Sequence, residues 1–254
     1  MNLDNLLLDL SERGVKMWAE DGQLRIRAPK GVLDQELKNL VTEHKTDILR
    51  LLNGKHAESR VEPVPRDQSL KLSFMQERMW FLAQMYPEGV AYNLPNAYRL
   101  KGPLDISALT ASLRDIVARH ESLRTTFCNV DGEAVQQVAS DYSLDLAVTD
   151  LGGLPASQQE ADRIALEDAN HAFDLENGPL FLCRILRFGA ADHLLLWTIH
   201  HIVADGWSSM IFLRELKTFY EARILGENAE LPSLPIQYAD FAAWERQYMA
   251  GDRL

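Results

Sequence analysis

The run LLLWTI at residues 194–199 constrains the fold of this chain more than any other stretch, because it is apolar at nearly every position. Such a continuous run is typical of a strand that is covered on both faces. Two histidines follow it, and Asp205 and Gly206 precede a helix expected from 207 to about 225. Because successive strand side chains point to opposite faces, one of His200 and His201 should face a site and the other the interior.

Four interpretations of the histidine pair compete. A metal site needs three or four ligands, and adjacent histidines rarely chelate one ion. A purely structural pair would have one buried and one exposed ring. A Ser-His-Asp arrangement could use Ser208 or Ser209, although the GxSxG elbow is missing from the sequence. General base catalysis of acyl transfer uses the whole stretch and fits it best.

The residues around the pair supply parts for acyl transfer. Imidazole titrates near neutrality and can take a proton from an amine or alcohol. Gly206 lets a reacting group come close. The N-terminus of the following helix offers N–H groups to a developing oxyanion. We therefore expect His201 or His200 to act at the end of the strand.

The first 54 residues predict a small αββαα unit. Leucines at 3, 6, 7 and 10 recur at helical spacing, and Gly14 follows as a stop. Two alternating runs then flank Asp21-Gly22, a pair that favours a two-residue hairpin turn. After Pro29, apolar residues at helical spacing continue to about Asn53-Gly54 and predict one or two further helices.

The predicted hairpin has two unlike faces. Pairing outward from the turn sets Ala19 opposite Leu24 and Met17 opposite Ile26, so one face is apolar. The other face carries Lys16, Trp18, Glu20, Gln23, Arg25 and Arg27. A tryptophan between basic residues, on strands with free edges, predicts a surface that binds a partner. Coverage of Trp18 by the helices is the plainer alternative.

Residues 55–67 predict a linker, since they hold few large apolar residues and no periodicity. Residues 68–254 predict a larger unit in which helices pack on a sheet, so the fold class is α+β with two domains. Ser73 and Gln76 have capping-box spacing, and Met75, Met79 and Leu82 mark the expected buried face of that helix. Other expected elements are a helix at 105–119, a hairpin around Asp131-Gly132, a helix at 156–172 and a last helix in YADFAAWERQYM.

Composition excludes several functions. The 26 basic and 37 acidic residues give a net charge of −11, which repels nucleic acid. Only Cys128 and Cys183 are present, which fits a reducing cytoplasm and no Cys-rich metal site. Neither a signal peptide nor a bilayer-spanning run is evident, so we expect no membrane partner. A dinucleotide-binding or Walker loop is also missing from the sequence.

HHIVADG resembles the HHxxxDG motif of nonribosomal peptide synthetase condensation domains and chloramphenicol acetyltransferase-like acyltransferases. LSFMQERMWFL, RHESLRTTF and YADFAAW resemble three further condensation-domain motifs, in the same order, over about 68–250. Met75 departs from the family's usual Ala, and Tyr92-Asn93 matches the expected YN. The first motif is most similar to that of domains that join an L-configured donor. Heterocyclisation domains carry aspartates in place of the paired histidines.

The resemblance implies roles for the loop residues. His201 acts on the acceptor amine, either as a base or by positioning it and stabilising the tetrahedral intermediate, and His200 points inward. Asp205 forms a structural ion pair, for which we choose Arg124 of RHESLRTTF, and a simple N-cap is the alternative. Gly206 borders the reaction channel. The implied reaction joins a carrier-bound acyl or peptidyl thioester to a carrier-bound aminoacyl group. The phosphopantetheine belongs to the carriers, and we expect no directly bound cofactor or metal.

Residues 14–49 resemble the tubulysin-synthetase type of N-terminal docking domain. That resemblance implies that the C-terminal tail of an upstream synthetase subunit binds here, and that upstream and downstream carrier proteins are further partners. Because the family's condensation domain has two lobes, we expect a fragment that lacks the C-terminal lobe and is inactive alone. The alternatives are a docking module only, or a stand-alone chloramphenicol acetyltransferase-like acyltransferase.

Overall fold

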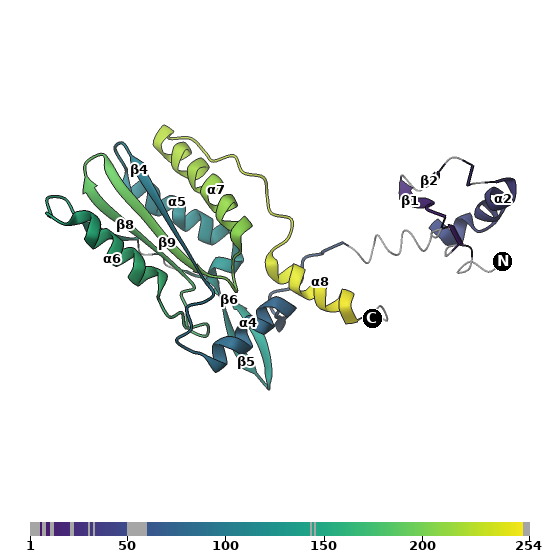
Figure 1. The fold of residues 1–254 in the computed structure, drawn as a ribbon, viewed down its shortest axis with the longest axis horizontal. Helices are drawn as coiled ribbons and strands as arrows, with labels where there is room; N and C mark the ends of the chain where they lie inside the picture. The colour runs from purple at the N-terminus through teal and green to yellow at the C-terminus, as the bar shows by residue number, and fades with distance from the viewer. Residues whose placement is uncertain are drawn as a thin grey trace. The chain divides into compact units, whose positions relative to one another are not determined.

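The computed structural model describes residues 6, 9–10, 13–20, 23–29, 31–32, 34–49, 60–142, 144 and 146–250. The chain divides into two compact units, Met1–Arg60 and Val61–Leu254 (Figure 1). Residues 61–67, which the sequence places in a linker, are thus part of the larger unit. The predicted boundaries at 54 and 68 otherwise remain predictions.

The N-terminal unit contains the predicted hairpin. Strands β1 (Lys16–Glu20) and β2 (Gln23–Arg27) pair antiparallel with Trp18 opposite Arg25, which confirms the predicted register. The predicted turn at 21–22 lies outside the described residues. Gly14 has a φ of +74°, a left-handed conformation that suits a helix stop.

Helices complete this unit. The described positions 6, 9 and 10 are helical, and α2 (Gln35–Glu43) begins at Asp34, whose side chain accepts from the N–H of Leu37 at 2.8 Å. Residues 45–49 are helical again. Among the described residues of this unit, the buried apolar side chains form one cluster: Leu6, Leu10, Val15, Leu37, Val41 and Ile48.

The larger unit is built on a four-stranded sheet in the order β4-β9-β8-β7. Its strands are β4 (Asn93–Lys101), β9 (Asp192–His200), β8 (Phe181–Gly189) and β7 (Ala147–Asp150). Strand β9 pairs antiparallel with both β4 and β8, and β7 is parallel to β8. The run at 194–199 therefore lies in an inner strand of this sheet.

Helices cover both faces of the sheet. The helices are α5 (Ile106–Arg119), α6 (Ser157–Ala169) and α7 (Gly206–Leu225). Figure 1 shows α6 against one face and α5 and α7 against the other. Leu195 and Trp197 of β9 share a core cluster with side chains of α5 and α7, whereas Leu196 packs with Ala161 and Ile164 of α6. This two-sided burial is the reason for the continuous apolar run.

A second, three-stranded sheet has the order β3-β6-β5. Its strands are β3 (Leu70–Lys71), β6 (Glu133–Val138) and β5 (Thr125–Val130), and the short helix η1 (Glu121–Arg124) precedes β5. Asp131 and Gly132 both have positive φ values, 53° and 89°, as the predicted hairpin turn requires. Helices α4 (Phe74–Met85) and α8 (Tyr238–Ala250) lie beside this sheet and contact one another (Figure 1).

Helix α4 confirms one prediction and corrects another. Ser73 and Gln76 form the predicted capping box. Met79 is buried, but Met75 is 56% exposed, so the expected place of Met75 on the core face is wrong. The buried stripe instead runs through Gln76, Met79 and Trp80, and Met75 lies about a quarter-turn away from Gln76.

Candidate active site at the end of strand β9

The histidine pair lies where β9 ends between its two neighbours. The N–H of His200 donates to the carbonyl of Leu180 at 3.0 Å, and the N–H of His201 donates to the carbonyl of Tyr92 at 2.8 Å. His200 is the last residue of the strand, and His201 begins a turn. The backbone of the pair is thus fixed from both sides of the sheet.

His200 is an interior side chain. It is 4% exposed, and its ring meets that of Phe173 edge-on with centroids 5.9 Å apart. Its Nδ1 accepts from the N–H of Ile202 at 3.2 Å. Burial lowers the pKa of His200 to about 4, and the neighbouring His201 adds a smaller contribution. His200 is therefore neutral near pH 7, and its Nδ1 serves as an acceptor that shapes the turn.

His201 has the opposite surroundings, since its side chain is partly exposed. The pair therefore divides as the alternation of a strand requires, with one ring inside and the next at the surface.

Asp205 is the N-cap of α7. Its carboxylate accepts from the N–H of Ser208 at 2.8 Å and from the Ser208 hydroxyl at 2.6 Å, and Ser208 Oγ accepts from the N–H of Asp205. The hydroxyl bond from Ser208 contributes most to holding the pKa of Asp205 below its usual value, while burial opposes it and His201 adds a smaller lowering. A carboxylate thus occupies the helix end where the sequence analysis expected N–H donors for an oxyanion.

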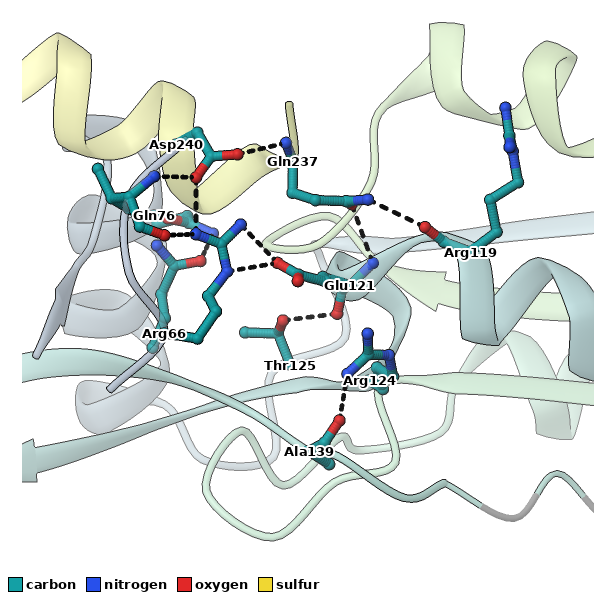
Figure 2. A network of polar contacts seen from close by, with 11 residues as sticks. Arg66, Gln76, Arg119, Glu121, Arg124, Thr125, Ala139, Gln237 and Asp240 are labelled. Carbon is teal, nitrogen blue, oxygen red and sulfur yellow. Dashed lines mark hydrogen bonds and ion pairs between the residues drawn. The ribbon is translucent and has the colours of Figure 1, made fainter. Parts of the chain in front are cut away.

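The predicted ion pair between Asp205 and Arg124 is wrong. The guanidinium of Arg124 donates to the carbonyl of Ala139, as Figure 2 shows, and the carboxylate of Asp205 is used by Ser208. The alternative N-cap interpretation of Asp205 is the one confirmed. Arg124 instead joins the end of η1 to Ala139, the residue directly after β6.

Gly206 opens α7 beside this loop. A Cβ placed on Gly206 would meet no described atom within 4 Å. Packing within this unit therefore does not require a glycine here, and the space beside it is open.

The structural interpretation of the pair agrees with these surroundings as well, whereas the metal and Ser-His-Asp interpretations find less support. Among the described residues, there is no group of three or more His, Cys, Asp or Glu side chains placed to hold a metal ion. The Ser208 hydroxyl is bonded to Asp205.

No helix in the described part of the chain is long and apolar enough to cross a membrane.

A network centred on Asp240 was not predicted from the sequence. Asp240, 1% exposed, accepts from the N–H groups of Val64 and Gln237 and from Arg66, which also pairs with Glu121 at 2.8 Å (Figure 2). Burial acts to raise the pKa of Asp240, but these hydrogen bonds outweigh it and hold the pKa below its usual value. The Asp of YADFAAW thereby fastens α8 to residues 64–66 and to η1.

The sequence analysis predicted Gln76 only as a capping residue of α4. Its side chain also donates to the carbonyl of Ile202, directly after the histidine pair. The contact spans 126 positions of sequence, so local spacing gave no signal for it.

In the N-terminal unit, the candidate docking face is exposed. Trp18 is 39% exposed, and Lys16, Arg25 and Arg27 are exposed beside it. Arg25 forms an ion pair with Glu20 at 3.0 Å, with both side chains more than half exposed. Such a pair is weak and can be replaced by a partner's carboxylates.

Comparison with known proteins agrees with the division of the chain into two units. A condensation domain model matches residues 66–254, and a TubC N-terminal docking domain model matches residues 3–53. The chain is 46% identical over 213 residues to a linear gramicidin synthase protein of Brevibacillus parabrevis, and the match covers 82% of this chain and 3% of that protein. It is 42% identical over 190 residues to phosphinothricin tripeptide synthetase PhsC of Streptomyces viridochromogenes, covering 74% of this chain and 18% of that protein.

Solved structures show the same fold. The cyclization-docking bidomain of EpoB from Sorangium cellulosum has a TM-score of 0.66 and 26% identity, and the match covers 98% of this chain and 49% of that one. The X-domain in complex with OxyB from teicoplanin biosynthesis has a TM-score of 0.69 and 34% identity, with coverage of 76% and 41%. The chain therefore belongs to the condensation domain family of nonribosomal peptide synthetases and begins with a TubC-type docking domain.

Proposed function

We propose that the larger unit takes part in amide formation between two carrier-bound substrates, with His201 as the residue that acts on the acceptor amine. The observation that carries this assignment is that His201 is the partly exposed histidine of the pair in a unit that matches the condensation domain model. His200 is buried and neutral near pH 7, whereas His201 is partly exposed on a backbone that is fixed on both sides.

In the proposed reaction, the amine of an aminoacyl thioester attacks the carbonyl carbon of an acyl or peptidyl thioester. A C–N bond forms, the C–S bond breaks, and the proton lost by the amine balances the departing thiolate of the donor's phosphopantetheine. His201 either takes that proton or positions the amine and stabilises the tetrahedral intermediate. Gly206, with open space beside it, borders the path of the substrates.

The phosphopantetheine arms belong to the carrier proteins and reach the site as part of the substrates. We propose that an upstream and a downstream carrier are partners of the larger unit. No further cofactor is needed for this acyl transfer, since both reacting groups arrive activated or nucleophilic. The two free cysteines fit a reducing cytoplasmic setting.

We further propose that the N-terminal unit binds the C-terminal tail of an upstream synthetase protein along the hairpin. Lys16, Arg25 and Arg27 would attract an acidic tail, and Trp18 would supply an apolar anchor. The exposure of this face and the match to a docking domain support the assignment.

Residues 1–254 alone are expected to bind partners without condensing substrates. The two solved relatives extend well beyond the matched part, since the match covers only 41% and 49% of their chains. A role as docking module only is the second candidate, and it rests on the exposed hairpin.

The test is a condensation assay in a two-lobed protein that contains these residues. An upstream carrier with an acyl thioester and a downstream carrier with an aminoacyl thioester are mixed, and amide product on the downstream carrier is measured by mass spectrometry. His201→Ala should lower the rate about 10²–10⁴-fold, the range typical of a general acid or base. Wild-type turnover by that variant, with the folded state verified, would contradict the assignment.

A further inference from the structure

Gln76 lies at a buried junction behind the histidine turn. It is 1% exposed, and its side chain makes three hydrogen bonds. The oxygen Oε1 accepts from the N–H of Ser73 at 3.0 Å, and Nε2 donates to Oε1 of Gln136 and to the carbonyl of Ile202, each at 3.2 Å. One side chain thus joins the start of α4, strand β6 and the turn after β9.

The chemistry of these partners fixes the orientation of the Gln76 amide. A backbone N–H can only donate and a backbone carbonyl can only accept, so the oxygen must face Ser73 and the nitrogen must face Ile202. An apolar residue of the same size could fill the space but could not hold the carbonyl of Ile202.

The bond to Ile202 completes the support of the turn. The N–H of His201 is held by Tyr92, and the N–H of Ile202 is held by Nδ1 of His200. Gln76 holds the carbonyl of Ile202, so the residue that follows His201 is fixed at both its N–H and its carbonyl. The carbonyl of Ile202 belongs to the peptide that follows Ile202, so Gln76 acts on the His201 ring through the backbone of Ile202, whose N–H lies in a peptide that flanks His201.

We propose that Gln76 is a positioning residue for His201: it sets the direction of the catalytic ring by holding the carbonyl of Ile202. The inference rests on the proposed function of His201. It gives Gln76 a role that differs from its capping of α4.

Two matched variants separate positioning from general support. Gln76→Met keeps the volume and loses all three bonds. Gln136→Met removes a buried glutamine of the same cluster, which also donates to the carbonyl of Lys71 at 2.8 Å, and leaves the bond to Ile202 available. Gln76→Leu also lacks the donor to Ile202 and introduces no buried charge, and it replaces Gln76→Met if that variant does not fold.

The first readout is the imidazole of His201, followed by nitrogen-15 NMR in residues 1–254 over a pH titration. Loss of the Gln76 donor should change the ring nitrogen chemical shifts of His201, and Gln136→Met should leave them unchanged. An unchanged His201 signal in the Gln76 variants, or equal changes in all variants, would overturn the inference. This readout needs no turnover and so is independent of the proposed function.

The second readout is condensation by the two-lobed protein. Gln76→Met should lower kcat about 10-fold to 100-fold with KM for the acceptor carrier unchanged, since displacement of a reacting group by about 1 Å has such an effect. Gln136→Met should keep the wild-type kcat. An unchanged kcat in Gln76→Met, while His201→Ala is inactive, would overturn the positioning role and leave the proposed function intact.

Discussion

The two units of this chain place their candidate functional residues in opposite surroundings. In the N-terminal unit, Trp18 and Arg25 lie on the outside of a hairpin, and the only ion pair described on that face joins two exposed side chains. In the larger unit, the turn that begins at His201 is held by buried polar side chains, since His200 and Gln76 both bond to the backbone of Ile202. A docking surface tolerates side chains that move, whereas a catalytic ring needs a fixed backbone.

The difference also appears in how each unit is stabilised. In the described part of the small unit, the buried side chains of the core cluster are all apolar. The larger unit adds buried polar residues such as Asp240 and His200, whose hydrogen bonds link segments far apart in sequence. Changes to these buried groups should therefore have large effects, and changes to the docking face should have small ones.

The largest expected effect on stability comes from protonation of His200. Its pKa is about 4 in the folded protein against an ordinary value of 6.5, so the unfolded chain binds the proton first as the pH falls. The contribution of neutral His200 to the free energy of unfolding is therefore fully present above about pH 6.5. It is lost progressively toward pH 4, by up to about 3 kcal/mol. Thermal unfolding of the larger unit, measured from pH 7 to pH 4, checks this.

His200→Asn is the matched variant, because its side-chain oxygen can replace Nδ1 as acceptor for the N–H of Ile202 and does not titrate in this range. The variant should show a flatter pH dependence between about pH 6.5 and pH 4. A slope identical to that of the wild type would show that another group is responsible.

A smaller loss is expected from Arg66→Ala, which leaves the buried Asp240 without its charged partner. Hydrogen bonds to charged groups contribute about 2 kcal/mol, and Asp240 keeps its two N–H donors. Denaturant unfolding should show this loss in the larger unit. Arg163→Ala, which removes an exposed arginine paired with Glu160 and Glu167, should have no measurable effect. Equal effects of the two variants would contradict a role for burial.

The cap of α7 is expected to contribute less. Asp205→Ala should lower the free energy of unfolding by about 1 kcal/mol, the usual effect of losing an N-cap. Arg124→Ala should add to it independently, because the two side chains have different partners. A double-mutant cycle measures the coupling energy between Asp205 and Arg124. A value clearly different from zero would indicate that the two side chains interact, contrary to the structure.

The smallest change is expected at the docking face. Arg25→Glu combined with Arg27→Glu should weaken binding of an acidic upstream tail about three- to tenfold, because exposed charge pairs contribute little each. The affinity should also fall as salt rises. Calorimetry with the tail peptide measures both effects, with the circular dichroism spectrum unchanged.

Lys38→Glu combined with Lys45→Glu makes the same change of charge on exposed helical positions of the same unit. This control should bind the tail like the wild type if the hairpin is the docking face. Equal weakening in both double variants would point to net charge alone.

Local patterns were enough to predict much of this molecule. Alternation and a turn pair gave the register of β1 and β2, and the spacing of Ser73 and Gln76 gave the cap of α4. The apolar run gave the buried strand β9, since burial on both faces removes the alternation.

The errors concern which side chains meet in space. Arg124 and Asp205 were paired from motifs, but Asp205 bonds to the nearby Ser208, and Arg124 bonds to the carbonyl of Ala139, 15 positions away. The bond between Arg66 and Asp240 joins residues 174 positions apart, and such a contact leaves no periodic signal in a single sequence. Met75 was assigned to the core because it shares a helical face with Met79 and Leu82, but the buried stripe of α4 includes the polar Gln76 instead.

If the N-terminal unit recognises a partner and the larger unit performs the chemistry, the two functions can be altered separately. The condensation rate of the two-lobed protein, measured as a function of the concentration of a tail-bearing upstream carrier, tests this separation. For Arg25→Glu combined with Arg27→Glu, we predict a higher half-saturating concentration and an unchanged rate at saturation. A lower rate at saturation, with the half-saturating concentration unchanged, would contradict this separation.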